Sequence, residues 1–202
     1  MIYAIAAPIF YASIAIIAIA ASRAVCKDIA PEEDGPPSGR PPYVILVVAS
    51  AIVGELLMYW HAMPLQLGIA AMVLFALVAC WCSDAVCGIV PDAFTLAPLA
   101  ALMLFSFAQR DWGMMISAAV VFVPFALAAF FSKGRGMGWG DVKLVALSGA
   151  ALGAPLVVFA LAAACGVAAV VHHFSRARRG PIAFAPYIAA FTGIALPLGL
   201  AR

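Results

Sequence analysis

Long apolar runs of 16 to 20 residues alternate along the chain with short polar or Pro- and Gly-rich breaks. Seven such runs occupy residues 3–22, 43–60, 65–82, 93–108, 113–131, 155–173 and 183–200. A helix that crosses a bilayer needs about 20 mainly apolar residues, so each run is a candidate transmembrane helix. A shorter run at 142–153 gives eight spans if it crosses the bilayer and seven if it does not. The pattern predicts an all-α fold, a polytopic membrane helix bundle of about eight transmembrane helices.

Composition supports a membrane protein and excludes several other classes. Of 202 residues, 67% are hydrophobic and only 10% are charged, whereas a soluble domain has about 25% charged residues. The formal net charge of +2 is too small to indicate a nucleic-acid partner. The composition therefore predicts membrane lipid as a partner. It does not indicate the oligomeric state.

The charged residues divide the chain and orient it. We expect residues 1–22 to form the first span, residues 23–42 a Pro-rich cytoplasmic loop, and residues 43–202 the helical membrane core. With eight spans and both termini outside, nine basic residues face the cytoplasm and two, Arg110 and Arg202, do not, which satisfies the positive-inside rule. Those nine are Arg23, Lys27, Arg40, Lys133, Arg135, Lys143, Arg176, Arg178 and Arg179. Seven spans would move the last three outward.

Two carboxylates fall at the predicted cytoplasmic face. Asp84 follows the third run, and Asp141 precedes the short run within a segment where every second residue from Gly134 to Gly140 is glycine. A charged residue at membrane depth is costly and is a candidate functional residue by default. In contrast, we expect Asp92, in the turn formed with Pro91, to cap the helix that follows it.

Paired carboxylates at one depth have a specific chemical use. Two close carboxyl groups cannot both ionise cheaply, so one keeps a proton while the other acts as a base, as an aspartic protease requires. Gly138 and Gly140 would let the backbone approach a substrate strand closely. We expect Lys143 to point away from Asp141, toward the membrane interface or lipid phosphate rather than toward the reacting groups.

Other interpretations of these residues stay open. A glycine-rich segment with one aspartate is often only a helix start, and the glycine spacing does not match a phosphate-binding loop. A small membrane carrier or channel would use Asp84, Asp141 and Glu55 as an ion path. Without such a path, Glu55 would make a buried hydrogen bond between helices.

Three segments together resemble the type IV prepilin peptidase family, whose members are GxGD aspartic peptidases. They are Asp84 with Pro91-Asp92, then Gly138-Trp139-Gly140-Asp141-Val142-Lys143-Leu144, and the late segment from Pro181 to Tyr187. The resemblance covers roughly residues 65–200. It implies a leader peptidase for type IV prepilins or pseudopilins in a bacterial inner membrane, with Asp84 and Asp141 as a catalytic dyad at the cytoplasmic face and Gly138, Gly140 and Pro91 shaping the backbone. A presenilin-like protease shares the chemistry, but it would place Tyr before the first aspartate, where Ser83 stands here.

The chain departs from the longer members of that family in its first loop. Those members carry two CxxC pairs there and also methylate the new N-terminus, whereas this loop has only Cys26. We therefore expect no metal and no cofactor, and methyl transfer stays open. The other cysteines are Cys80, Cys82, Cys87 and Cys165. We expect most of the five to be small packing residues rather than disulfide partners.

Overall fold

The computed structural model describes residues 2–29, 41–60, 63–132, 137–174 and 184–200. This part of the chain is helical throughout, with no strand. Its elements are α1 (Ile2–Ile29), α2 (Tyr43–Tyr59), α3 (Pro64–Cys87), α4 (Asp92–Gln109), α5 (Trp112–Phe131), α6 (Trp139–Leu152), α7 (Ala154–Phe174) and α8 (Ala185–Leu200). The predicted all-α bundle of eight helices is confirmed.

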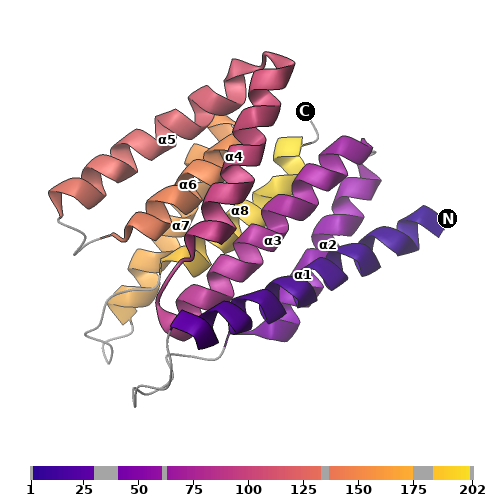
Figure 1. Ribbon diagram of the computed structural model, residues 1–202, viewed down its shortest axis with the longest axis horizontal. Coiled ribbons are helices and arrows are strands. Elements are labelled where there is room, and N and C mark those ends of the chain that lie inside the picture. Colours follow the sequence, from indigo (N-terminus) through magenta and orange to yellow (C-terminus); the bar gives the residue numbers. More distant parts are fainter. Residues whose placement is uncertain (1, 30–40, 61–62, 133–136, 175–183, 201–202) are drawn as a thin grey trace.

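The helices pack as a bundle of roughly parallel and antiparallel rods (Figure 1). α3 and α8 pack together near the centre, with α1 and α2 on one side of them. On the other side α6 packs against α8, with α4, α5 and α7 around it. The helices that bear the two candidate aspartates, α3 and α6, are thus both neighbours of α8.

Five helices in the described part of the chain are long and apolar enough to cross a membrane, namely α1, α3, α4, α5 and α7. α6 has only 14 residues, about 21 Å of helix, which is less than the roughly 30 Å hydrocarbon core. Nearly every residue of α6 from Val142 to Leu152 is buried. This helix is apolar on all sides because other helices surround it.

Two helices extend beyond their predicted ends. α1 continues to Ile29, past the predicted limit at residue 22, and α3 continues to Cys87, past the predicted limit at residue 82. The extension of α1, about two turns, carries Lys27 and Asp28, which are exposed and so cost little at a helix end. Residues 30–40 of the predicted Pro-rich loop lie outside the described residues, as do Lys133, Arg135, Arg176, Arg178 and Arg179.

A buried hydrogen bond aligns the two helices that frame the site. The Thr192 hydroxyl on α8 donates to Oγ of Ser148 on α6 at 2.9 Å, and Ser148 donates to the Leu144 carbonyl. Ser148 lies two turns after Asp141, and Thr192 lies two turns after Ala185, the first residue of α8. The starts of α6 and α8 therefore lie side by side.

Candidate active site

Asp84 lies in the last turn of α3, where the helix is closed by glycine. Gly88 adopts a left-handed conformation with φ of 66°, and its backbone N–H donates to the Asp84 carbonyl at 2.9 Å. Glycine adopts this conformation without the steric cost of a side chain, so it ends the helix here. The Asp84 side chain is only 9% exposed. A carboxyl group is thus buried at the end of an apolar helix.

Asp141 is the third residue of α6 and is partly exposed. Gly138 is the N-cap residue, and its backbone N–H is hydrogen bonded to the Asp141 carboxylate. A carboxylate at this position satisfies a free backbone donor and interacts favourably with the helix dipole. Asp141 therefore has the role at the start of a helix that the sequence left open. The same hydrogen bond fixes the direction of its carboxylate.

The two carboxyl groups are close enough to interact electrostatically. Cys80, one turn before Asp84, also lies within electrostatic range of both. The backbone amide of Ala185 is hydrogen bonded to Asp84, so α8 contributes to the site as well. Oδ2 of Asp84 is the one buried side-chain N or O atom in the described part of the chain that has no hydrogen-bond partner.

That unpartnered oxygen sets the chemistry of the site. A buried carboxylate oxygen without a donor is costly, so it favours a proton on one of the two acids or a donor from a bound molecule. The pair can therefore hold one proton between them and exchange it with a third group. This is what general acid–base catalysis by two carboxyl groups requires.

Close packing between the turn after α3 and the start of α6 holds the pair in place. A Cβ atom on Gly140 would lie 2.7 Å from Cβ of Val90, so only glycine allows this contact. A Cβ on Gly138 would meet Oδ2 of Asp141 at an ordinary 3.6 Å, and Gly138 has φ of −75°, which any residue adopts. Gly140 accommodates the Val90 side chain, and its expected approach to a substrate strand stays a prediction. Pro91 follows as the N-cap residue of α4.

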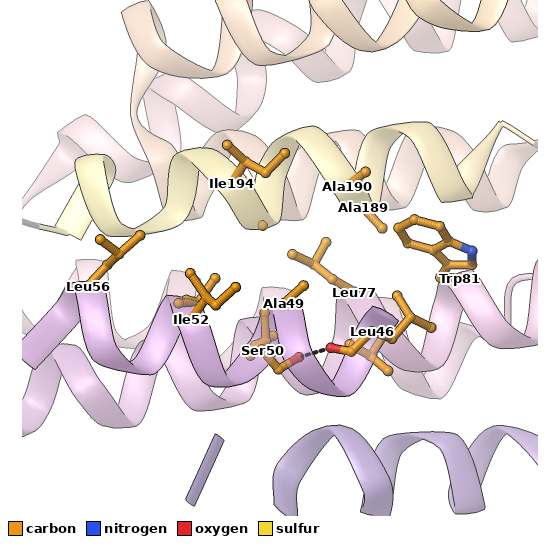
Figure 2. A pocket seen from close by; sticks show the side chains of 14 residues that line it. Leu46, Ala49, Ser50, Ile52, Leu56, Leu77, Trp81, Ala189, Ala190 and Ile194 are labelled. Atoms are coloured by element: carbon orange, nitrogen blue, oxygen red, sulfur yellow. Dashed lines mark hydrogen bonds between the residues drawn. The ribbon is translucent and has the colours of Figure 1, made fainter. Parts of the chain in front are cut away.

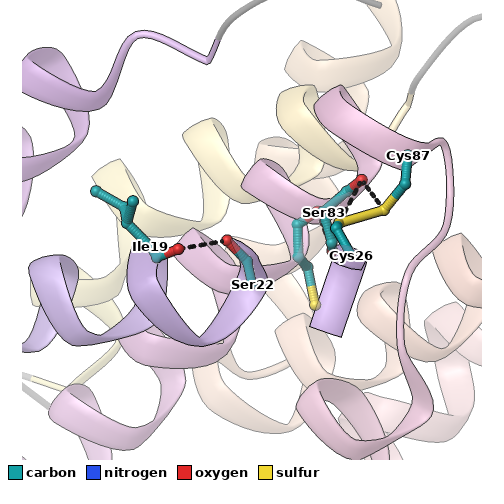
Figure 3. The surroundings of a disulfide bond; sticks show 6 residues. Ile19, Ser22, Cys26, Ser83 and Cys87 are labelled. Carbon is teal, nitrogen blue, oxygen red and sulfur yellow. Dashed lines mark hydrogen bonds between the residues drawn. A yellow bond between two sulfur atoms is a disulfide. The ribbon is translucent and has the colours of Figure 1, made fainter. Parts of the chain in front are cut away.

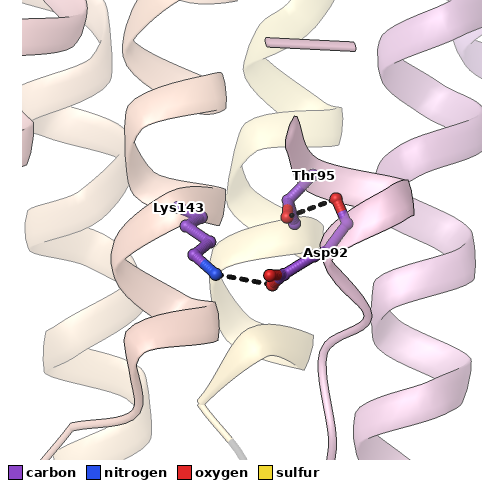
Figure 4. Close-up of polar contacts among 3 residues, drawn as sticks. All are labelled: Asp92, Thr95 and Lys143. Atoms are coloured by element: carbon purple, nitrogen blue, oxygen red, sulfur yellow. Dashed lines mark hydrogen bonds and ion pairs between the residues drawn. The ribbon is translucent and has the colours of Figure 1, made fainter. Parts of the chain in front are cut away.

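An ion pair crosses the same junction (Figure 4). Nζ of Lys143 lies 2.5 Å from Oδ1 of Asp92. The expected assignment of Lys143 to the interface or to lipid phosphate is wrong as to its partner, which is Asp92. The expectation that Asp92 caps α4 is also wrong: Asp92 is the first residue of the helix, its side chain faces Lys143, and the α4 N-terminus has no side-chain cap.

A disulfide bond joins Cys26 in the last turn of α1 to Cys87 in the last turn of α3, with Cα atoms 6.2 Å apart (Figure 3). For these two cysteines the expected packing role is wrong. Cys80, Cys82 and Cys165 are free. Because Cys87 is three residues after Asp84, the bond fixes α1 beside the candidate site.

Glu55 takes no part in this arrangement. Its side chain is exposed on α2, so the expected buried hydrogen bond is wrong. The start of α2 lies at the site end of the bundle, where the Arg23 guanidinium stacks over the Tyr43 ring at 4.3 Å. Glu55 is twelve residues further on, about 18 Å along the helix.

Sequence reasoning proposed the two aspartates, which the structure places within electrostatic range of each other, but it missed their neighbours. Cys80 lies in no motif. Val90 precedes Pro91 and Ala185 lies within the late segment of the resemblance, but their contacts with the site depend on packing between distant segments. The disulfide had a usable signal, since Cys26 and Cys87 follow odd-numbered spans and must end on the same face. Asp92 and Lys143 also had a usable signal, because they carry opposite charges and follow the two candidate aspartates by eight and two residues.

Comparison with known proteins adds one match. A sequence model of the type IV leader peptidase family matches residues 69–173, slightly more than half of the chain. The match includes Asp84, Pro91, Gly138, Gly140 and Asp141, while α8 lies outside it. Neither the curated proteins nor the solved structures gave a match.

Proposed function

Because the chain belongs to the type IV leader peptidase family, a family of peptidases, we propose that it cuts leader peptides by an aspartic mechanism. Asp84 and Asp141 form the dyad. The observation that carries this proposal is the pairing of two carboxyl groups from separate helices, one with a buried, unpartnered oxygen. If Asp84 had only a structural role as part of an ion pair, a cationic side chain would lie beside this oxygen.

The dyad acts on a water molecule and a peptide carbonyl. The ionised aspartate takes a proton from the water, whose oxygen attacks the carbonyl carbon. The protonated aspartate donates to the carbonyl oxygen and stabilises the tetrahedral intermediate. Proton transfer to the leaving nitrogen then breaks the C–N bond. The Ala185 amide and the Gly138 amide hold one carboxylate each.

The substrate of this reaction is a type IV prepilin or pseudopilin, and the site faces the cytoplasm in a bacterial inner membrane. Arg23, Lys27 and Lys143 support this orientation, because all three lie at the site end of the bundle and basic residues favour the cytoplasmic side. A basic rim attracts anionic lipid headgroups. The family resemblance implies a positively charged leader, which a basic rim does not attract, so the leader charge is not the main recognition feature.

The test replaces each aspartate by asparagine in the purified protein and follows prepilin cleavage by mass spectrometry of the new N-terminus. Asp84→Asn and Asp141→Asn should each lower the rate by at least about 100-fold, since each removes a general acid or base. Asp28→Asn is the matched control, because Asp28 is an exposed acid at the same end of the bundle. Its rate should equal that of the wild type.

Circular dichroism and gel filtration in detergent show whether the variants fold. Normal cleavage by a folded Asp84→Asn or Asp141→Asn protein would exclude the dyad. The same mass spectra show whether the product also gains a methyl group.

A further inference from the structure

An apolar groove of about 270 Å³ lies between α2, α3 and α8 (Figure 2). Its lining has two polar side-chain groups, the Ser50 hydroxyl and the Trp81 indole N–H. The Ser50 hydroxyl donates to the Leu46 carbonyl of its own helix at 2.8 Å, so it offers no free donor. The groove therefore favours an apolar occupant.

The groove begins at the candidate active site. Trp81 lies at one end of it, three residues before Asp84 on α3. On α8 the groove begins at Ala189, one turn after Ala185, whose amide holds Asp84. From there it continues to Leu56 at the other end of the view in Figure 2. Its course is thus away from the aspartates and into the apolar part of the bundle.

The groove is open along one side. Ile52 of α2 and Ile194 of α8 line it and are 54% and 70% exposed, so the opening faces the lipid. Its volume is below the roughly 300 to 1,000 Å³ of pockets that enclose a whole small ligand. Side chains that project from a helix lying over the opening would fit this space.

Small residues allow such a helix to come close. Ala49, Ala190 and Gly193 lie among the lining residues, and small residues let helix backbones approach one another in a membrane. A Cβ atom added to Gly193 would meet nothing within 4 Å. The groove therefore has unfilled space beside the α8 backbone.

We propose that this groove receives an apolar membrane helix of the substrate, next to the scissile bond, and thereby places that bond at Asp84 and Asp141. The proposal rests on the proposed peptidase function. A polypeptide segment that lies in hydrocarbon must be helical, because no water satisfies its backbone there. A helix seated between α2 and α8 leads directly to the aspartates, so its first unwound residues reach them. Recognition is then by apolar shape in the membrane, which the basic rim does not oppose.

The first experiment fills the groove. Gly193→Leu adds a side chain into the open space, and Gly166→Leu is the matched control, because Gly166 is an exposed α7 residue whose added Cβ also meets nothing within 4 Å. Two substrates are compared in proteoliposomes: a prepilin that the wild-type protein cleaves, and a peptide from it that lacks the apolar helix. Gly193→Leu should lower the ratio of kcat/KM for the prepilin to that for the peptide by about tenfold, the effect of a misfitted apolar group.

The outcomes separate the two proposals. An unchanged ratio in folded Gly193→Leu, or an equal fall in Gly166→Leu, would overturn the groove proposal while leaving the peptidase intact. Cleavage that does not need Asp84 and Asp141 would instead exclude the proposed mechanism.

The second experiment does not depend on the folding of a groove variant. A photocrosslinking amino acid at Ile194 should capture the prepilin through its apolar segment. The same amino acid at Val170, a 55% exposed residue of α7, should not. Capture of lipid alone, or of a second copy of the chain, from Ile194 would overturn the proposal.

Discussion

Lys143 and Asp92 form an ion pair with 2.5 Å between Nζ and Oδ1, and it joins the start of α4 to the helix that carries Asp141. The two side chains are 27% and 62% exposed. An ion pair this exposed contributes about 0 to 1 kcal/mol to the free energy of unfolding. Its main effect is on the relative position of α4 and α6, and hence on the site.

Breaking this ion pair should affect activity more than stability. Lys143→Met and Asp92→Asn are each expected to lower kcat/KM by roughly fivefold, which corresponds to about 1 kcal/mol of transition-state stabilisation. The melting temperature should change little. The exchanged pair Asp92→Lys with Lys143→Asp is the control and should recover most of the loss. If the exchanged protein is no better than the single variants, the pair does not position the site.

The two glycines before Asp141 should differ in their tolerance of alanine. Gly140→Ala places a Cβ atom 2.7 Å from Cβ of Val90, and overpacking of this kind costs about 1 to 3 kcal/mol. Gly138→Ala makes an ordinary contact and should be close to the wild type. Thermal unfolding and prepilin cleavage measure both effects.

Val90→Gly removes the Cβ atom that the alanine meets, so it should partly rescue Gly140→Ala. Equal effects of alanine at the two glycines would contradict the packing explanation.

The Cys26–Cys87 disulfide predicts a defined thiol count. When the protein is extracted with a thiol-blocking reagent and denatured, three cysteines should be alkylated before reduction and five after it. Cys26→Ser should lower the free energy of unfolding by about 2 kcal/mol or more, since the bond closes a long loop. Cys165→Ser is the control, because Cys165 is free and exposed. Five alkylated cysteines before reduction would show that the bond does not form, which is the outcome that a reducing cytoplasm with access to this end of the bundle would produce.

A Glu55 variant distinguishes the peptidase hypothesis from the carrier hypothesis. Because its side chain is exposed and lies about 18 Å along α2 from the site end, Glu55→Gln should leave prepilin cleavage unchanged. Proton flux into proteoliposomes should also be the same for the two proteins. Flux that needs Glu55, Asp84 and Asp141 would favour the carrier hypothesis.

The helices could be predicted well from the sequence, because helix formation in a bilayer depends mainly on the local run of apolar residues. The length of each apolar run determines whether it suits a bilayer, and all eight predicted runs are helical. Helix ends were less predictable, as α1 and α3 show. Charged residues such as Lys27 can extend a helix into the interface, so the end of hydrophobicity is not the end of the helix.

The candidate site was predictable only in part. Alternation of spans places Asp84 and Asp141 at one face, and no packing information is needed for that. The Ala185 amide and the Val90–Gly140 contact depend on which helices are neighbours, a property of the whole bundle. Lys143 was misread for the same reason, because its partner Asp92 is brought close only by the contact between α4 and α6.

The hydrogen bond between the Ala185 amide and Asp84 has a consequence for biosynthesis. α8 is made after both helices that carry the aspartates, and it supplies both this amide and one wall of the groove. A partly synthesised chain that already contains both aspartates therefore lacks a complete site. On the proposed mechanism, the chain cannot cleave neighbouring proteins before α8 is inserted, and proteolysis begins only after that helix is in place.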